Sequence, residues 1–395
     1  MHMLTVMLVG LAMGATVYIG QAVGGGDAEK TARGIGNSAV LFLAVSVLLT
    51  GLLLVLVRPI VAVMATPAEA VEGTVAYLRI CFIGIPFITA YNLISSIFRG
   101  LGDSRSPMYF VAVACGINIA LDYLFMGVWR MGPAGAALGT TLSQTVSVLI
   151  ALLAILRRDS GVLGKKDDWK PQWPVMSRIL RVGLPIALQD GLIQVAFIVI
   201  TIIANQRALA DAAAVGIVEK IIGFLFLVPS TLLSTVSAMG AQNIGAGREE
   251  RARQTLRYAI GLAVVYGLTA ALIMQGAAEA AVGLFTDAST AEGMQVVRLG
   301  GQYMRGYVWD CFLAGIQFSF SGYFCACGRS DLSFLHNLLS VVLVRVPGAY
   351  LTSRLFADTL FPMGLASAAG SMLSVIVCLI AFRHLRRKEK EKSLG

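Results

Sequence analysis

The sequence predicts an all-α polytopic membrane protein built from two pseudo-symmetric helical lobes. Of its 395 residues, 57% are hydrophobic and 13% are charged, whereas charged residues make up about 25% of an average soluble domain. Several apolar runs exceed the ~18 residues that mark a membrane-spanning helix. In addition, short motifs of the first half return in the same order in the second half. These three observations leave no room for a sizeable soluble domain.

Long continuous apolar runs predict helices, because barrel strands would appear as short alternating segments. At Ser106-Pro107, Ser fits the N-cap and Pro the first helical position. Gly102 and Gly328 fit the left-handed residue that ends a helix, and segment 183–185 (Gly-Leu-Pro) is expected to kink or unwind its helix. The eleven predicted spans are 1–24, 35–64, 68–99, 107–129, 134–157, 176–206, 212–243, 250–284, 293–326, 331–355 and 362–386.

Basic residues are concentrated in alternate loops. Segments 157–181, 248–257 and 383–395 contain seven, four and six Lys or Arg residues, whereas segments 59–78 and 284–297 contain none. Because Lys and Arg collect in cytoplasmic loops, the C-terminus is predicted to be cytoplasmic. The same distribution accounts for the net charge of +9, so we expect no nucleic-acid partner.

The two halves of the chain show an internal duplication. The matched pairs are Gln21 and Gln242 (offset 221), Tyr77 and Tyr303 (226), Gly102 and Gly328 (226), and Gly135 and Gly364 (229). Several matches in one order at nearly one offset indicate a repeat. Equivalent loops of both halves carry the cytoplasmic charge signal, so the repeats are parallel, which is an arrangement known from transporters.

The repeat defines the predicted domain organisation. We expect an N-terminal lobe at 1–157, a cytoplasmic inter-lobe loop at 158–175, a C-terminal lobe at 176–388 and a cytoplasmic tail at 389–395. The C-terminal lobe has six predicted helices and the N-terminal lobe has five. We therefore expect the missing counterpart of 176–206 to precede Met1, which means that the chain as written lacks the first helix of its pattern.

Polar residues inside the predicted spans are candidate functional groups, because placing them in a membrane is costly. Asp122 follows Asn118 by four residues, so both side chains share one helix face. Asn92 and Thr140 add oxygen atoms on neighbouring spans. Oxygen ligands of this kind can bind Na⁺ or relay H⁺, so we predict a cation-binding site formed by Asn92, Asn118, Asp122 and Thr140. The alternative is that Asp122 caps a loop near the outer interface.

A second set of polar residues is predicted to bind substrate. Asp190 and Gln194 are again four residues apart, and Asp310 lies among aromatic residues that could stack on a flat or cationic compound. Arg345 is expected either to pair with a carbonyl or carboxylate or to contact substrate.

The sequence predicts no cofactor and no metal centre other than possible Na⁺ at the cation site. Its six cysteines form no CxxC pair and its three histidines are scattered, whereas a zinc site needs clustered ligands. It also lacks a nucleophile–base constellation, so we do not expect an enzyme.

The segment SSIFRGLGDSRSPMYFVAVACGINIALDYLFMGVWRMGPAGAALGTTLSQ (95–144) resembles the multidrug and toxic compound extrusion (MATE) family. Its second-half counterparts are AMGAQNIGAGREERA (238–252) and GYFCACGRSDLS (322–333). The resemblance extends over nearly the whole chain. It implies a twelve-helix exporter of two six-helix lobes, which expels organic cations and other amphipathic compounds in exchange for Na⁺ or H⁺. In the family, an Asp of the first helix completes the cation site whose later positions match the four residues predicted above, and that Asp has no counterpart here.

The predicted function is therefore multidrug or toxic compound efflux by alternating access. We expect small amphipathic or cationic substrates, contact with membrane lipid, a monomer, and a multi-pass location in the cell (inner) membrane. One alternative is a flippase for lipid-linked oligosaccharides, in which Arg345 is the candidate contact for a pyrophosphate. The other is a truncated exporter that no longer transports.

Overall fold

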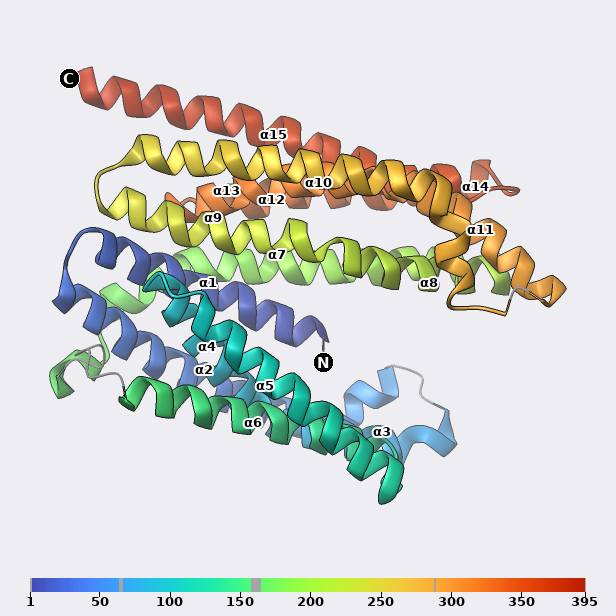
Figure 1. The fold of residues 1–395 in the computed structure, drawn as a ribbon, viewed down its shortest axis with the longest axis horizontal. Coiled ribbons are helices and arrows are strands. Elements are labelled where there is room, and N and C mark those ends of the chain that lie inside the picture. Colours follow the sequence, from blue (N-terminus) through green and yellow to red (C-terminus); the bar gives the residue numbers. More distant parts are fainter. Residues whose placement is uncertain (1, 64–66, 158–164, 288, 395) are drawn as a thin grey trace. The chain divides into compact units, whose positions relative to one another are not determined.

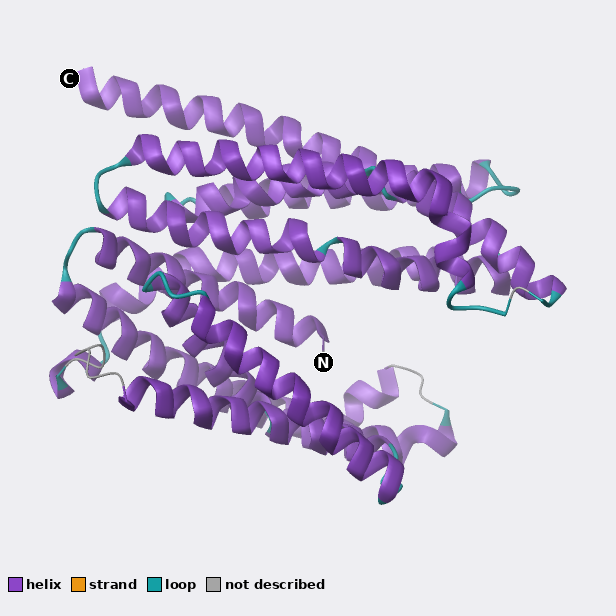
Figure 2. Cartoon of the chain, viewed as in Figure 1, coloured by secondary structure: helices purple, strands orange, loops and turns teal. Residues whose placement is uncertain are grey.

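A computed structural model describes residues 2–63, 67–157, 165–287 and 289–394, and its regular elements there are all helices (Figure 1, Figure 2). Eight of these helices are long and apolar enough to cross a membrane. Two further pairs, bent by 42° and 40°, raise the number of candidate spans in the described residues to ten. The prediction of an all-α polytopic fold is confirmed.

The chain divides into two compact units, residues 1–187 (unit 1) and 188–395 (unit 2). The elements of unit 1 are α1 (His2–Gly24), α2 (Ala28–Val63), η1 (Ala68–Ala70), α3 (Val71–Ile83), α4 (Ile85–Gly100), α5 (Arg105–Asp122), η2 (Tyr123–Val128), α6 (Pro133–Arg157) and η3 (Lys166–Trp169). Helix α7 (Trp173–Asn205) contains the boundary between the units.

The elements of unit 2 that follow α7 are α8 (Leu209–Leu225), α9 (Leu227–Gly245), α10 (Glu249–Gly283), α11 (Ala291–Tyr307), α12 (Asp310–Ala326), α13 (Ser330–Ser340), η4 (Val341–Arg345), α14 (Val346–Leu355) and α15 (Phe361–Leu394). The helices of both units pack in the same pattern. In unit 1, α4 packs on α1, α2 and α6, and α6 also packs on α3 and α5. In unit 2, α12 packs on α9, α10 and α15, and α15 also packs on α11 and α13.

The predicted span 293–326 is present as the two helices α11 and α12, each of 17 residues. Neither helix is among the candidate spans. Each helix is too short by itself to be a candidate span, and α11 also carries five charged or amide side chains, which are Glu292, Gln295, Arg298, Gln302 and Arg305.

Equivalent turns of the two units have the same backbone hydrogen bonds. The amide of Asp27 donates to Ala22, and the amide of Arg248 donates to Asn243, around glycines with φ of 69° and 71°. Both partners of this Schellman turn are offset by 221 (248 − 27 and 243 − 22). The matched segments after Gln21 and Gln242 therefore form a tight helical hairpin in each unit.

A second pair of turns has the offset of 226. The amide of Asp103 donates to Phe98, and the amide of Arg329 donates to Phe324. The αL residues are Gly102 and Gly328, with φ of 90° and 71°, which confirms their predicted conformation. These paired turns support the internal duplication, because both the hydrogen-bond pattern and the spacing repeat.

The same offsets relate the helix crossing at the centre of each unit. In unit 1, the Thr16 hydroxyl of α1 donates to the carbonyl oxygen of Ser96 on α4 at 3.1 Å. In unit 2, the Ser237 hydroxyl of α9 donates to the carbonyl oxygen of Gly322 on α12 at 3.2 Å. The first partners differ by 221 (237 − 16) and the second by 226 (322 − 96). Each hydroxyl thus joins two packed helices at an equivalent point.

Small residues allow the helices to meet at these crossings. A Cβ on Gly100 would lie 3.0 Å from the Cβ of Ile19, and a Cβ on Gly240 would lie 2.8 Å from the Cβ of Ala326. The positions correspond by the two offsets (240 − 19 = 221 and 326 − 100 = 226). The glycine is on α4 in unit 1 and on α9 in unit 2, so the two units keep the close approach with the glycine on opposite partners.

Two local predictions need correction. Helix α5 begins at Arg105, and the side chain of Asp103 accepts hydrogen bonds from the backbone amides of Arg105 and Ser106, so Ser106 is not the N-cap. Of the kink or unwinding expected at 183–185, the unwinding does not occur, because helix α7 is continuous through Pro185. Gly183 is instead a packing residue, because a Cβ there would lie 2.2 Å from the carbonyl oxygen of Leu11 on α1.

The segment between α6 and α7 docks on α2 where the structure describes it; residues 158–164 lie outside the described residues. Asn37 of α2 donates to the carbonyl oxygen of Asp168 at 3.4 Å and accepts from the amide of Gln172 at 2.6 Å. Gly36 makes room for the same carbonyl, since a Cβ there would lie 2.5 Å from it. These contacts attach residues 168–172 to unit 1.

We predict that Gly322→Ala destabilises the protein, because the new Cβ would lie 2.6 Å from the carbonyl oxygen of Leu233. Overpacking of this kind costs about 1–3 kcal/mol. The matched control is Gly261→Ala on α10, where no heavy atom lies within 4 Å of the added Cβ. Thermal unfolding in detergent should show a lower melting temperature for Gly322→Ala alone, and equal melting temperatures would contradict the crossing described above.

Candidate functional site

The predicted cation-binding residues are carried by three helices of unit 1 that pack against one another. Asn92 is on α4, Asn118 and Asp122 are on α5, and Thr140 is on α6. Each of these helices contacts the other two, and Figure 1 shows α5 and α6 side by side. The structure therefore gathers the four positions into one helix group, although they span 49 residues of sequence (92 to 140).

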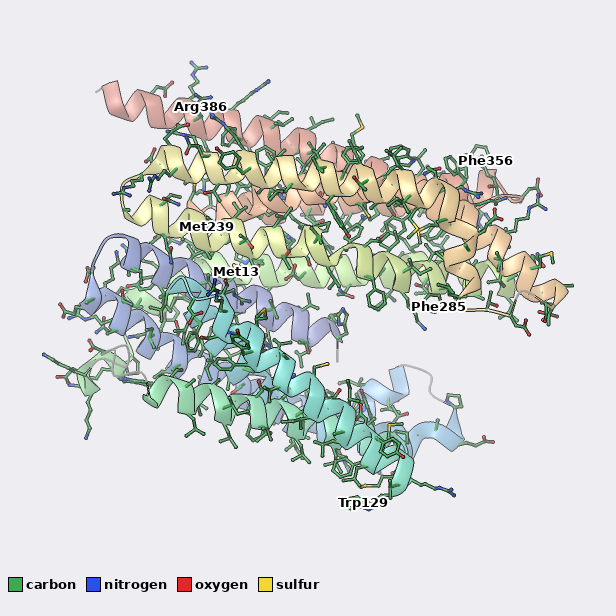
Figure 3. The ribbon with its side chains drawn as sticks, in the orientation of Figure 1. Met13, Trp129, Met239, Phe285, Phe356 and Arg386 are labelled. Atoms are coloured by element: carbon green, nitrogen blue, oxygen red, sulfur yellow. The ribbon has the colours of Figure 1, made fainter. Side chains whose placement is uncertain are left out.

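Asn118 and Asp122 lie in the last turns of α5, immediately before the π-helical segment η2. A π-helical turn inside a membrane helix frequently marks a functional site. Helix α5 is regular through both residues, so the i, i+4 spacing does place them on one face. Figure 3 shows Trp129, the residue that follows η2, at the end of the helix formed by α5 and η2.

The side chains of Asn118 and Asp122 each have a polar atom that forms no hydrogen bond in the described residues. Within the described residues, Oδ1 of Asp122 and Nδ2 of Asn118 are buried and have no hydrogen-bond partner. No ion pair of the described residues includes Asp122. A buried carboxylate oxygen without a partner is costly, so the site suits a ligand that brings positive charge.

Gly139 of α6 brings this helix against the carboxylate. A Cβ on Gly139 would lie 2.3 Å from Oδ1 of Asp122. The adjacent residue Thr140 is exposed, and its hydroxyl donates to the carbonyl oxygen of Ala136 at 3.0 Å. Asn92 is buried, and its amide nitrogen donates to the carbonyl oxygen of Ile88 at 2.9 Å, which leaves its amide oxygen as an acceptor.

The predicted substrate-binding residues lie in unit 2. Asp190 and Gln194 are partly buried on the second half of α7 and share one face of a continuous helix. Asp310, the first residue of α12, is fully buried and forms an ion pair with Arg345 at the end of η4. Of the two outcomes expected for Arg345, the structure shows the pairing with a carboxylate.

Two features of these sites carry no sequence signal. Glu219 of α8 accepts a hydrogen bond from the Thr201 hydroxyl of α7 at 3.3 Å, although no motif connects the two residues. Gly139 is one of 42 glycines, and only the packing of α6 on α5 singles it out. No group of three or more His, Cys, Asp or Glu residues that could hold a metal occurs in the described part of the chain.

Comparisons with known proteins agree on one family. The model of the family MatE matches residues 1–124 and 185–351. A probable multidrug resistance protein of Bacillus subtilis, YpnP, is 27% identical over 381 residues, which cover 96% of this chain and 84% of the relative. A probable multidrug resistance protein of Thermotoga maritima, NorM, is 27% identical over 410 residues, covering 99% and 85%.

Solved structures show the same fold. A crystal structure of MATE in complex with MaL6 superposes with a TM-score of 0.91 at 23% sequence identity. The alignment covers 98% of this chain and 86% of the solved one.

We predict that Gly139→Ala weakens cation binding about 10-fold, a loss typical of disturbing the support behind a ligand. The new Cβ would occupy the place of Oδ1 of Asp122 and displace the carboxylate without removing it. The control is Gly116→Ala, which lies on the same helix as Asp122 and has no heavy atom within 4 Å of the added Cβ. Equal ²²Na⁺ affinities, and equal pH dependence of transport, for both variants would contradict a cation site at this carboxylate.

Proposed function

Because the chain belongs to the MatE family of transporters, we propose that it exports amphipathic or cationic organic compounds and couples their exit to the entry of Na⁺ or H⁺. The names of its relatives, which are multidrug resistance proteins, support this substrate class. The observation that carries the coupling proposal is the partly buried Asp122, whose Oδ1 has no partner in the described residues.

Asp122 supplies the charge of the proposed cation site. An isolated carboxylate inside a membrane is unfavourable, and either a bound Na⁺ or a proton removes its net charge. Asn118, one turn earlier, offers an amide oxygen to Na⁺ or an amide donor to the carboxylate. Asn92 and Thr140 lie on the two helices that pack on α5, and in our proposal they supply further oxygen ligands.

Coupling follows if the cation favours one conformation and the substrate favours the other. A ligand shifts a conformational equilibrium by the difference between its affinities for the two states. In our proposal, neutralisation of Asp122 stabilises the state that releases substrate outside, and loss of the cation inside restores the state that accepts substrate. Asp190 and Gln194, both partly buried on α7, are the proposed substrate contacts.

Topology and assembly are part of the proposal. Arg386 lies on an exposed stretch near the end of α15 (Figure 3), and its basic neighbours support a cytoplasmic C-terminus in the cell membrane. We propose that the protein works as a monomer.

A flippase for lipid-linked oligosaccharides has less support. Its pyrophosphate substrate would need unpaired cationic side chains inside the protein. Arg345, the candidate for this contact, is bound to Asp310. We therefore prefer the exporter.

The test is substrate export from proteoliposomes with an imposed Na⁺ or H⁺ gradient, with ethidium as the probe. We predict that Asp122→Asn reduces gradient-driven export by about 10-fold or more, because a charged ligand of the cation is lost. Asp287→Asn is the matched control, since Asp287 is an exposed loop acid that hydrogen-bonds with Ser289.

Each result has a definite meaning. Loss of export in Asp122→Asn, with normal export in Asp287→Asn, supports coupling at Asp122, and the gradient that drives the wild type identifies the ion. Unchanged Na⁺ and pH dependence in Asp122→Asn would overturn the assignment. Wild-type protein that exports no ethidium under either gradient would overturn the proposed function.

A further inference from the structure

The ion pair of Asp310 and Arg345 is the most deeply buried pair of opposite charges in the described residues. The side chain of Asp310 is 0% exposed and that of Arg345 is 7% exposed, and Nη2 of Arg345 donates to Oδ2 of Asp310. Polar atoms around the pair remain without partners, namely Oδ1 of Asp310, Nε of Arg345 and the hydroxyls of Tyr303 and Tyr307. Burying two charges costs desolvation free energy that their attraction need not repay, so this ion pair is not explained by its contribution to stability.

The internal repeat shows what lies at the same place in unit 1. Between the matched pairs with offsets of 226 and 229, Tyr123 and Tyr350 match at 227 (350 − 123), and the following leucines match at the same offset. With this offset Arg345 corresponds to Asn118 (345 − 227). With the offset of 226 found at the crossings, Asp310 corresponds to Gly84 (310 − 226).

Helix packing supports this correspondence. In unit 1, a Cβ on Gly84, the counterpart of Asp310, would lie 2.8 Å from Oγ1 of Thr141 on α6. In unit 2, a Cβ on Gly370 of α15 would lie 3.1 Å from the Cβ of Arg345. With the offset of 229 found for the last long helix, Gly370 corresponds to Thr141 (370 − 229). Asp310, Arg345 and Gly370 of unit 2 therefore match Gly84, Asn118 and Thr141 of unit 1.

We propose that Arg345 is a tethered cation, whose guanidinium occupies in unit 2 the position that the exchangeable cation takes beside Asn118 and Asp122 in unit 1. This inference rests on the cation site of the proposed function. The chain then has one exchangeable cation site, in unit 1, and one permanently occupied counterpart, in unit 2.

The charges of the two sites agree with this assignment. The unit 1 site contains one carboxylate, that of Asp122, and no ion pair of the described residues joins it to a Lys or Arg side chain. An external cation is therefore needed to neutralise it. In unit 2, Arg345 replaces the amide of Asn118, and Asp310 replaces Gly84, where Thr141 fills the space instead. The acid and the base appear together in unit 2, and their charges cancel without an external ion.

The test is chemical rescue of Arg345→Ala with guanidinium ion in purified full-length protein. Removal of the Arg345 side chain beyond Cβ leaves the Asp310 carboxylate without its cation. It also opens a space that a guanidinium ion can enter. We expect a melting temperature several degrees below that of the wild type, and recovery of at least half of this loss in guanidinium chloride at tens of millimolar. Choline chloride, whose cation is too large for the space, should give no recovery.

Controls separate rescue of Asp310 from general salt effects. Asp310→Asn/Arg345→Ala has no carboxylate to neutralise, so it should not respond to guanidinium. A wild-type melting temperature for Arg345→Ala, or an equal response of the single and double variants, would overturn the inference. If Arg345→Ala does not fold, the variants Arg345→Lys and Asp310→Asn/Arg345→Met test the inference instead. The first keeps a tethered cation beside Asp310, and the second has no carboxylate that needs one.

We expect both of these variants to fold, and the export that each retains to show the ion dependence of the wild type, whatever the rate of export. A changed ion dependence in Asp310→Asn/Arg345→Met would mean that unit 2 takes part in ion exchange, and would overturn the inference. Failure of the proposed function is distinguishable, because it appears as wild-type protein that exports no ethidium under either gradient. Failure of the cation-site assignment appears as equal ion dependence of the wild type and Asp122→Asn, whatever Arg345→Ala does in guanidinium.

Discussion

Each unit contains an extensive and close helix crossing, between α1 and α4 in unit 1 and between α9 and α12 in unit 2. Within a membrane, lipid tails are as apolar as the helices, so close backbone approach and interhelical hydrogen bonds must hold the helices together. Both crossings use a side-chain hydroxyl that reaches a carbonyl oxygen of the partner helix. The glycine that makes room is on α4 in one unit and on α9 in the other, so the space at the crossing is kept rather than the position of the glycine.

The two units share this framework but differ in their buried charges. Asp122 in unit 1 has a buried oxygen with no partner in the described residues, whereas Asp310 in unit 2 is neutralised by Arg345. A third acid, Glu219, accepts from the neutral hydroxyl of Thr201. Because an uncompensated charge inside a membrane is unfavourable, these local differences decide which unit can respond to an external cation. A symmetric framework thus supports asymmetric chemistry.

Predictions from sequence succeeded where the cause is local. Gly102 and Gly328 have the left-handed conformation expected at helix ends, since a residue without Cβ adopts it at no steric cost. They failed where neighbours along the chain compete. Asp103 rather than Ser106 caps α5, because its carboxylate accepts from two amides at once. The segment 183–185 was expected to kink or unwind α7, but α7 is continuous there and Gly183 is the contact point for α1.

The sequence by itself determined the fold class, the repeat and the candidate polar residues, because run length, composition and spacing are properties of the chain. It also placed Asn118 and Asp122 on one face, since helical periodicity fixes that relation. Only the tertiary structure decided which groups meet. Asp310 and Arg345 are 35 residues apart, and Gly139 reaches Asp122 from another helix. Such contacts depend on the rotation and register of packed helices, which many distant side chains set together and no local pattern records.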